Sequence, residues 1–487
     1  PHMTNFSTLL SSFIEAKNIQ IYPLTQYCNL DRSTMYKYIN GKRLPPRQEL
    51  VERIADYMRL SPSEHDELLT AWKIALIGEE DYYNRKNAEN FILNFPDVSK
   101  IDPLILSSFS VSSGTENPDP LSDCQALSSQ TAINHAVSQT ILREAEKENG
   151  RLALLLQPDN DYLFHFLTSL GESECTLSIE QILCLNNSSQ LDKSYHSLNL
   201  LYIQNVLPLY IRALDYDIYY YYDNVGSHFS SFNGLSCLIL TSESAVACTS
   251  DYRTGIFYSQ PEAVRLLWEL FRGYKEKCSL LFHPVSSITE ELNMLQTLGQ
   301  STEINYAIQP EPCLVPFITP DLVEKYVRPD LPDRESLIPM LNHYLSLQKD
   351  TVLSDYFHVY HTLEGIRSFL ETGKIYEIPE GLCIPFSPED RTLLISRLLQ
   401  NPKKNYQLLR GPLQHLPHNF HLYVSPSGGY LLFTNRLNQT VYLLFEEPGL
   451  LAAFLDYLNH LDINYLYTYE QMQALILELV GKGEKQS

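Results

Sequence analysis

The 487-residue sequence has no two cysteines at C-x-x-C spacing, and its nine cysteines are scattered along the chain. An odd, dispersed set argues against a disulfide framework or a zinc knuckle and indicates reduced thiols. The sequence shows no signal peptide, and no apolar run approaches the roughly 18 to 20 residues that a membrane helix needs. We therefore expect a cytoplasmic protein with no membrane partner.

Short catalytic motifs are also missing. The sequence contains no G-x-S-x-G, no G-x-G-x-x-G and no H-E-x-x-H. Near the C-terminus, Gly481-Lys-Gly lacks the preceding strand and the further glycine of a phosphate-binding loop. These absences predict that the chain is not an enzyme and that it holds no cofactor.

Basic residues are scarce, because 36 Lys and Arg stand against 58 Asp and Glu, a formal net charge of −22. Such a balance repels nucleic acid. The charge is unevenly divided, however. Residues 1–60 hold eight basic and five acidic residues, a net of +3, whereas the other 427 hold 28 basic and 53 acidic, a net of −25. Contact with nucleic acid is therefore expected only through the basic N-terminal segment.

This basic segment has the pattern of a small helical domain. Apolar residues recur at helical spacing and predict helices near residues 6–16, 23–28, 32–40, 50–58 and 62–76. Asp31 is placed to cap the third helix, and Gly41 to end it. The short turn at Asn29 between the second and third helices is the plan of a helix-turn-helix, in which the third helix enters the DNA major groove.

The stretch from Arg32 to Arg47 contains five cations and no acidic residue. Cations neutralise phosphates, and polar side chains on an inserted helix can contact base edges. The candidate DNA-binding residues are Arg32, Ser33, Thr34, Tyr36, Lys37, Asn40, Lys42, Arg43 and Arg47. The alternative is an ordinary helical cap whose cations form a solvated face.

The sequence from Leu24 to Pro45, LTQYCNLDRSTMYKYINGKRLP, resembles the XRE (Cro/C1-type) family of helix-turn-helix transcription regulators. The resemblance covers about the first 75 residues. Thr25 stands where the family usually has alanine, and Asn29 where it usually has glycine. The resemblance implies a head that binds double-stranded DNA. One head offers only about five phosphate contacts, so we expect a homodimer on an inverted-repeat operator.

The rest of the chain has a different pattern. A stretch rich in Ser, Pro and Gly between Leu106 and Asp123 is the best linker candidate, and helices then alternate with short β-rich runs. The predicted fold class is therefore multidomain, with an all-α helix-turn-helix head and a large α/β or α+β body. The predicted divisions are an expression scar (1–3), the DNA-binding domain (4–77), a helical connector and Ser/Pro linker (78–125), and α/β sensor modules at 126–310 and 311–487.

Two parts of the body follow the same order of three strands, an acid or amide before proline, and a helix. The first part runs from Leu235 to Cys278 and the second from Leu422 to Leu458. Their low identity leaves a chance match open, whereas a real repeat would give two related modules with a cleft between them. That arrangement resembles the effector halves of some bacterial regulators with a phospholipase-D-like body. The His-x-Lys signature of that fold is absent, which implies a binding descendant.

Two groups of histidines have spacing that could suit a metal. His358 and His361 fall on a predicted helix and would share one face, but no acidic residue completes the set. His415, His418 and His421 lie in an irregular, proline-containing segment. Ordinary surface or core histidines account for both groups, so no metal site is predicted.

Tyrosine is abundant, with 33 residues, five of them between Tyr216 and Tyr222. An apolar ring with a hydrogen-bonding tip suits a ligand pocket. On a strand, Tyr220 and Tyr222 would share one face, and they are the candidate ligand-binding residues. The alternative is that these tyrosines pack a sheet between helices.

Together these features predict a one-component bacterial transcription regulator. Its head would bind an operator, and its body would bind a small-molecule effector and dimerise. The body is far larger than a dimerisation element, which suggests a second input. The alternative from another class is a DNA-tethered interaction protein whose body binds a protein or peptide partner. An enzyme fused to a DNA-binding head is the weakest hypothesis.

Overall fold

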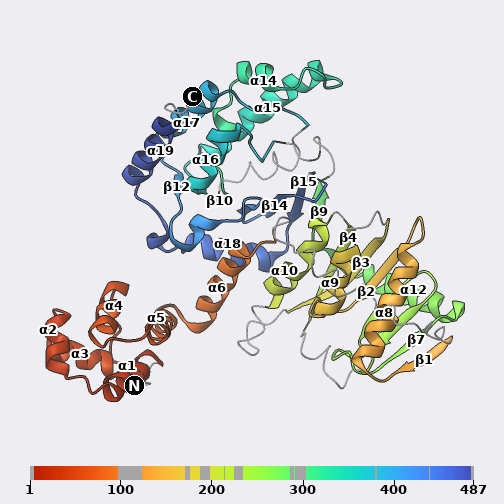
Figure 1. Cartoon of the computed structure of the whole chain (residues 1–487), viewed down its shortest axis with the longest axis horizontal. Coiled ribbons are helices and arrows are strands. Elements are labelled where there is room, and N and C mark those ends of the chain that lie inside the picture. Colours follow the sequence, from red (N-terminus) through yellow and green to blue (C-terminus); the bar gives the residue numbers. More distant parts are fainter. Residues whose placement is uncertain are drawn as a thin grey trace. The chain divides into compact units, whose positions relative to one another are not determined.

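The computed structural model describes residues 5–96, 123–170, 176–186, 198–212, 214–223, 234–285, 290, 303–378, 381–437 and 439–483. The chain divides into two compact units, Pro1–Lys86 and Asn87–Ser487. Figure 1 shows the elements of each. The predicted expression scar, and the predicted linker apart from Asp123, lie outside the described residues.

The first unit, called the head, is helical. Its helices are α1 (Asn5–Ala16), α2 (Ile21–Tyr27), α3 (Arg32–Ile39), α4 (Gln48–Tyr57), α5 (Pro62–Ile77) and the first half of α6 (Glu79–Leu93). Local signals set these boundaries. The Asp31 carboxylate accepts from the Thr34 N–H at 2.8 Å, and Asn29 and Gly41 both adopt positive φ. The helices enclose one apolar core that includes Phe6, Leu24, Met35, Ile54 and Trp72.

The second unit, called the body, contains two mixed sheets. The first has the order β1-β7-β6-β5-β2-β3-β4-β8. Its strands are β1 (Cys124–Leu127), β2 (Arg151–Leu155), β3 (Ser178–Asn186), β4 (Asp215–Asp223), β5 (Cys237–Leu240), β6 (Ala245–Cys248), β7 (Gly255–Tyr258) and β8 (Ser279–Leu280).

The second sheet has the order β12-β11-β10-β13-β14-β15-β9. Its strands are β9 (His283–Val285), β10 (Asn305–Ile308), β11 (Phe357–His361), β12 (Tyr406–Leu408), β13 (His421–Ser425), β14 (Gly428–Thr434) and β15 (Thr440–Phe445). Strands before and after the predicted boundary at 310/311 therefore share one sheet. We call the part built on β1–β8 the first module and the part built on β9–β15 the second module.

The two sheets share a topology over seven strands. Read from β1 to β4 and from β9 to β12, both contain four antiparallel pairs followed by two parallel pairs. A second likeness supports the alignment, because Gln157-Pro158 follows β2 and Gln309-Pro310 follows β10. The structure thus supports the repeat indicated by the sequence.

Helices cover both faces of each sheet. In the first module they are α8 (Gln130–Ala145), α9 (Asp161–Leu170), α10 (Leu198–Ile211) and α12 (Pro261–Lys275). In the second they are α14 (Pro320–Tyr326), α15 (Arg334–Val352), α16 (Leu363–Thr372), α17 (Pro388–Leu399), α18 (Pro448–Asn459) and α19 (Tyr469–Gly483), with short 3-10 turns at Val315–Phe317, Gly411–His415 and Ile463–Tyr465.

One large core joins the two modules. It takes residues from one face of each sheet, from α8, α9, α10 and α18, and from the end of α6, where Phe91 packs on Phe454 and Phe95 on Phe420. The opposite, outer faces have separate cores: α12 covers the first sheet, whereas α14 to α17 and α19 cover the second.

This architecture confirms the predicted fold class, a multidomain protein with a helical N-terminal region and an α/β body. Among the described helices, none combines the length and apolar content needed to cross a lipid bilayer.

Candidate functional site

The first candidate site is the exposed face of α3 in the head. Met35 and Tyr38 point into the head's core and fix the rotation of the helix. That rotation leaves Arg32, Tyr36 and Lys37 exposed. Ser33, Asn40, Lys42, Arg43 and Arg47 are exposed as well.

The cations of this face are available to a ligand. None of the five between Arg32 and Arg47 forms an ion pair with a described residue of the chain. The nearest acid in sequence, Asp31, is occupied at the helix N-terminus, where hydrogen bonds from Thr34 lower the pKa of its carboxyl to about 2. In this structure Thr34 serves the N-cap of the helix, because both its N–H and its hydroxyl donate to the N-cap residue Asp31.

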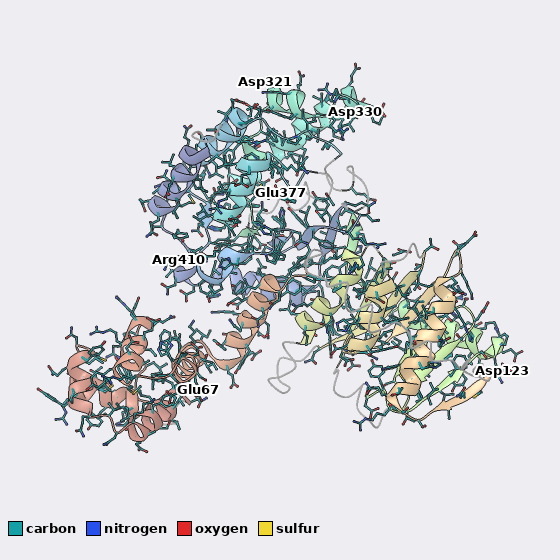
Figure 2. The ribbon with its side chains drawn as sticks, viewed as in Figure 1. Glu67, Asp123, Asp321, Asp330, Glu377 and Arg410 are labelled. Carbon is teal, nitrogen blue, oxygen red and sulfur yellow. The ribbon has the colours of Figure 1, made fainter. Side chains whose placement is uncertain are left out.

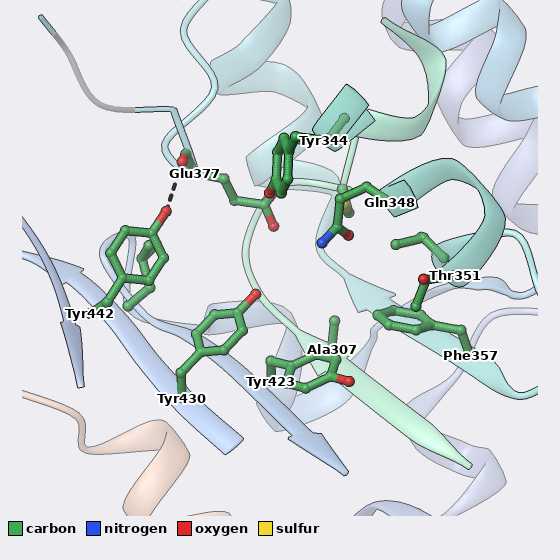
Figure 3. Close-up of a pocket in the computed structure, with 13 residues that line it drawn as sticks. Ala307, Tyr344, Gln348, Thr351, Phe357, Glu377, Tyr423, Tyr430 and Tyr442 are labelled. Carbon is green, nitrogen blue, oxygen red and sulfur yellow. Dashed lines mark hydrogen bonds between the residues drawn. The ribbon is translucent and has the colours of Figure 1, made fainter. Parts of the chain in front are cut away.

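The second candidate site is a pocket on the outer face of the second sheet (Figure 3). Strands β10, β13, β14 and β15 form its floor, and α15 and the segment after α16 form its roof. Its lining residues are Ala307, Cys313, Val315, Tyr344, Gln348, Thr351, Val352, Phe357, Glu377, Tyr423, Tyr430, Leu432 and Tyr442.

Three tyrosines from adjacent strands form an aromatic wall of this pocket. Tyr423 and Tyr430 are cross-strand partners whose rings stack 5.1 Å apart at 13°. Tyr442 follows at 5.9 Å from Tyr430, and its hydroxyl donates to the Glu377 carbonyl at 3.0 Å. The wall therefore depends on strand register rather than on closeness in sequence.

Glu377 supplies the charged group of the pocket. It lies inside the second module, whereas Asp321 and Asp330 lie at its exposed edge (Figure 2). Burial raises the pKa of the Glu377 carboxyl, and it also raises that of Glu311, whose carboxylate accepts from the Tyr376 N–H at 2.6 Å. No described residue lining the pocket is basic.

The first module lacks this arrangement on its equivalent face. Even-numbered residues of β2 and odd-numbered residues of β10 make the backbone hydrogen bonds to the next parallel strand, so Leu154 aligns with Ala307. The strand registers then place Ile239 where the second module has Tyr423, and Val246 where it has Tyr430. There α9 and α10 pack onto the sheet in a closed apolar core. The pocket thus arises where aromatic side chains around a cavity replace the aliphatic side chains of a closely packed core.

Tyr220 and Tyr222 lie on β4, with their rings 5.6 Å apart. The Tyr222 hydroxyl donates to Glu447, the N-cap residue of α18, so this residue connects the first module to the second. The tyrosines that line the pocket are others, and sequence analysis did not select them. The ligand-binding role of Tyr220 and Tyr222 stays a prediction.

The helix predicted at His358 and His361 is wrong, because both residues lie on strand β11. Side chains three residues apart on a strand point to opposite faces of the sheet. His358 and His361 therefore do not share one face, as the helix prediction required. Burial lowers the pKa of His361 to about 4 and that of His421 to about 3. Among the described residues, no group of three or more His, Cys, Asp or Glu is arranged to hold a metal.

Comparison with known proteins gives no family. The chain matches no known protein family and no curated protein sequence. Several solved structures are similar, and three of them are described below, each at 12% sequence identity.

The first is TrmBL2, an archaeal chromatin protein with a novel mode of DNA binding, at a TM-score of 0.23, covering 46% of this chain and 72% of that one. Phosphatidylserine synthase from Haemophilus influenzae Rd KW20 has a TM-score of 0.23, and the match covers 82% of this chain and 97% of that one. Polyphosphate kinase from Porphyromonas gingivalis has a TM-score of 0.20, and the match covers 72% of this chain and 54% of that one. Similarities of this size define no function for the chain.

Two of these three proteins are enzymes, so the prediction that the chain is not an enzyme is withdrawn. That prediction rested only on missing short motifs. Catalytic groups that come from distant parts of a sequence leave no such motif, so their absence is a poor argument.

Proposed function

We propose that this protein is a DNA-binding transcription regulator of the helix-turn-helix type whose body binds a small-molecule effector. The head contacts double-stranded DNA through α3 and the segment that follows it. Its second helix and its third are joined by a turn at Asn29, which has the positive φ that such a turn uses.

The observation that carries the proposal is the exposed, acid-free surface from Arg32 to Arg47. Its five cations have no ion-pair partners among the described residues, and polar Ser33, Tyr36 and Asn40 are exposed on or beside the same helix. Cations can hold phosphates while the polar groups contact base edges. A surface serving only solubility would have no need to exclude acids over 16 residues of an otherwise acidic chain.

The test is to select duplexes from a random pool with the full chain and then to measure affinity for the enriched sequence. Arg32→Ala and Lys37→Ala should each weaken binding by about 1–3 kcal/mol if the side chain contacts a base edge. Lys73→Ala, which removes the same charge from α5, is the matched control. If nothing is enriched, or if all three variants bind equally well, the proposed DNA interface is wrong.

The body supplies the sensing part of the proposal. The tyrosine-lined pocket of the second module has the mixture of aromatic walls and few polar groups that is typical of small-molecule sites. An effector regulates only if it binds the DNA-competent and the incompetent state with different affinity. Its effect on operator affinity is therefore the measure of regulation. We further expect a homodimer on an inverted repeat.

One observation favours the alternative of a protein or peptide partner for the body. Leu266, Leu270 and Tyr274 recur every four residues along α12 and are 55%, 46% and 48% exposed. An apolar stripe of this kind is typical of a surface that another protein covers. Light scattering of the full chain at several concentrations would show whether a second copy already covers it.

A further inference from the structure

We propose that the pocket of the second module binds a small organic cation, an alkyl ammonium whose charged end lies at Glu377 and whose chain enters an adjoining apolar pocket. This inference rests on the proposed sensing function and names the chemical class of the effector. Its evidence is the set of groups that face the cavity.

Hydrogen-bond acceptors converge on one space without a basic partner. The side chains of Glu377, Tyr430 and Gln348 point toward the same opening from a loop, a strand and a helix (Figure 3). Within the described part of the chain, the Glu377 carboxylate forms no ion pair, and the Tyr430 hydroxyl and the Gln348 amide make no hydrogen bond. A primary ammonium has three N–H donors and would match three such acceptors.

The titratable groups around Glu377 also favour a cation. Glu311, Cys313, Tyr406 and Tyr430 surround it, and none of them can supply a positive charge. The groups that hydrogen-bond to the Glu377 carboxyl, Gln309 and Cys313, are neutral, and an opposite charge would relieve the cost of burying the carboxylate. An anionic ligand would instead add repulsion to two nearby carboxyl groups.

The aromatic wall adds a second attraction for a cation. The stacked rings of Tyr423 and Tyr430 and the tilted ring of Tyr442 lie beside the acceptors. The negative face of a tyrosine ring attracts an ammonium, most strongly where water is excluded. The first module has Ile239 and Val246 at the positions of Tyr423 and Tyr430, so its equivalent face lacks this wall.

A neighbouring pocket defines the space for the hydrocarbon part of the ligand. It shares Val315, Tyr344 and Glu377 with the first pocket, and its remaining lining is almost wholly apolar, with Leu322 and Phe386 among its side chains. The cavity volumes are about 30 Å³ at the tyrosines and about 70 Å³ in the apolar part. For comparison, one buried water needs about 10–15 Å³ of cavity volume on this scale. The first pocket therefore has room for a compact ammonium group, and the second for a short hydrocarbon chain.

The experiment compares three probes of equal length on the full chain at pH 7.5, without DNA. Hexylamine, hexan-1-ol and hexanoate each have six carbons and carry a cationic, a neutral and an anionic head group at this pH, and calorimetric titration gives their affinities. We expect hexylamine to bind at least about tenfold more tightly than hexan-1-ol, because a charged hydrogen bond contributes about 1.5–3 kcal/mol. Hexanoate should bind most weakly.

Variants then test the residues. Glu377→Gln keeps the shape of the side chain and should weaken hexylamine about tenfold or more, while leaving hexan-1-ol unchanged. Tyr430→Phe should weaken hexylamine by a smaller factor, because the ring remains. Glu371→Gln, an exposed acid on α16, is the control that removes an equal charge. Circular dichroism confirms that each variant is folded.

Equal affinity for hexylamine and hexanoate, or an unchanged hexylamine affinity in Glu377→Gln, would overturn the proposal. Because the titration contains no DNA, such a result would leave the DNA interface untouched. If hexylamine binds as expected but does not alter operator affinity, the cation site stands and the proposed regulation fails.

Discussion

The two modules of the body share one strand order but differ in the side chains and helices on the same face of the sheet. In the first, α9 and α10 lie between the parallel strands and close an apolar core with aliphatic residues such as Ile239 and Val246. In the second, α14 to α17 lie between the equivalent strands, and the equivalent face has tyrosines around a cavity. The comparison teaches that sheet topology positions a site, whereas the side chains of that face decide whether a core or a pocket forms.

The largest effect on stability should come from a substitution in the closely packed first module. Trp268 is buried on α12, and its indole N–H donates to the Thr241 carbonyl at 2.9 Å. Trp268→Ala leaves a large cavity and should lower the free energy of unfolding by about 3–5 kcal/mol in urea, followed by circular dichroism. Leu266→Ala, on the exposed side of the same helix, should change it by no more than about 0.5 kcal/mol. Similar losses for both would mean that α12 does not form a core with the sheet.

A pH effect should come from the second module. His361 and His421 are buried in that module. Their folded pKa values of about 4 and about 3 lie below the ordinary 6.5, so the unfolded chain takes up protons first. Stability is therefore complete above pH 6.5 and falls as the pH drops below it.

At pH 5.5 each of these histidines should cost about 1.4 kcal/mol of stability relative to pH 7.5. Urea unfolding at the two pH values measures the difference. The double variant His361→Gln and His421→Gln should reduce it, and His165→Gln, which is exposed in the first module, should not. An undiminished pH effect in the double variant would place the responsible groups elsewhere.

A smaller effect of opposite sign should come from the pocket itself. Burial raises the pKa of Glu377, so the folded chain holds this proton at pH values where the unfolded chain has released it. Stability from this group therefore declines as the pH rises above its ordinary value of 4.5. Glu377→Gln should raise the urea midpoint at pH 8 and leave it unchanged near pH 4. A lower midpoint at pH 8 would show that the carboxylate is stabilised in the folded state.

Sequence analysis was most successful where structure depends on neighbours along the chain. In the head, Asp31 and Gly41 give local capping and stop signals, and the structure places α3 between them. In the body, the sequence predicted helices alternating with short strands, and the structure contains this alternation. The repeat was seen only at its three antiparallel strands and following helix, whereas the full correspondence needs the parallel pairs as well.

The pocket could not be predicted in the same way. Tyr423 and Tyr430 meet only through the register of β13 and β14, and Glu377 comes from a loop more than 40 residues earlier. The short strand β11 was mistaken for a helix because the prediction followed the spacing of two histidines alone, and a five-residue segment is too short to establish a period. One signal was present and overlooked: the repeated Gln-Pro-acid sequence after β2 and β10 marks equivalent strand ends.

The salt dependence of DNA binding tests the central claim most directly. Affinity of the full chain for its selected duplex would be measured at several salt concentrations, for the wild type and for the double variant Lys42→Ala and Arg43→Ala. Two lost phosphate contacts should weaken binding and reduce the slope of log affinity against log salt by about 2. An unchanged slope and affinity would contradict the assignment of DNA contact to the surface from Arg32 to Arg47.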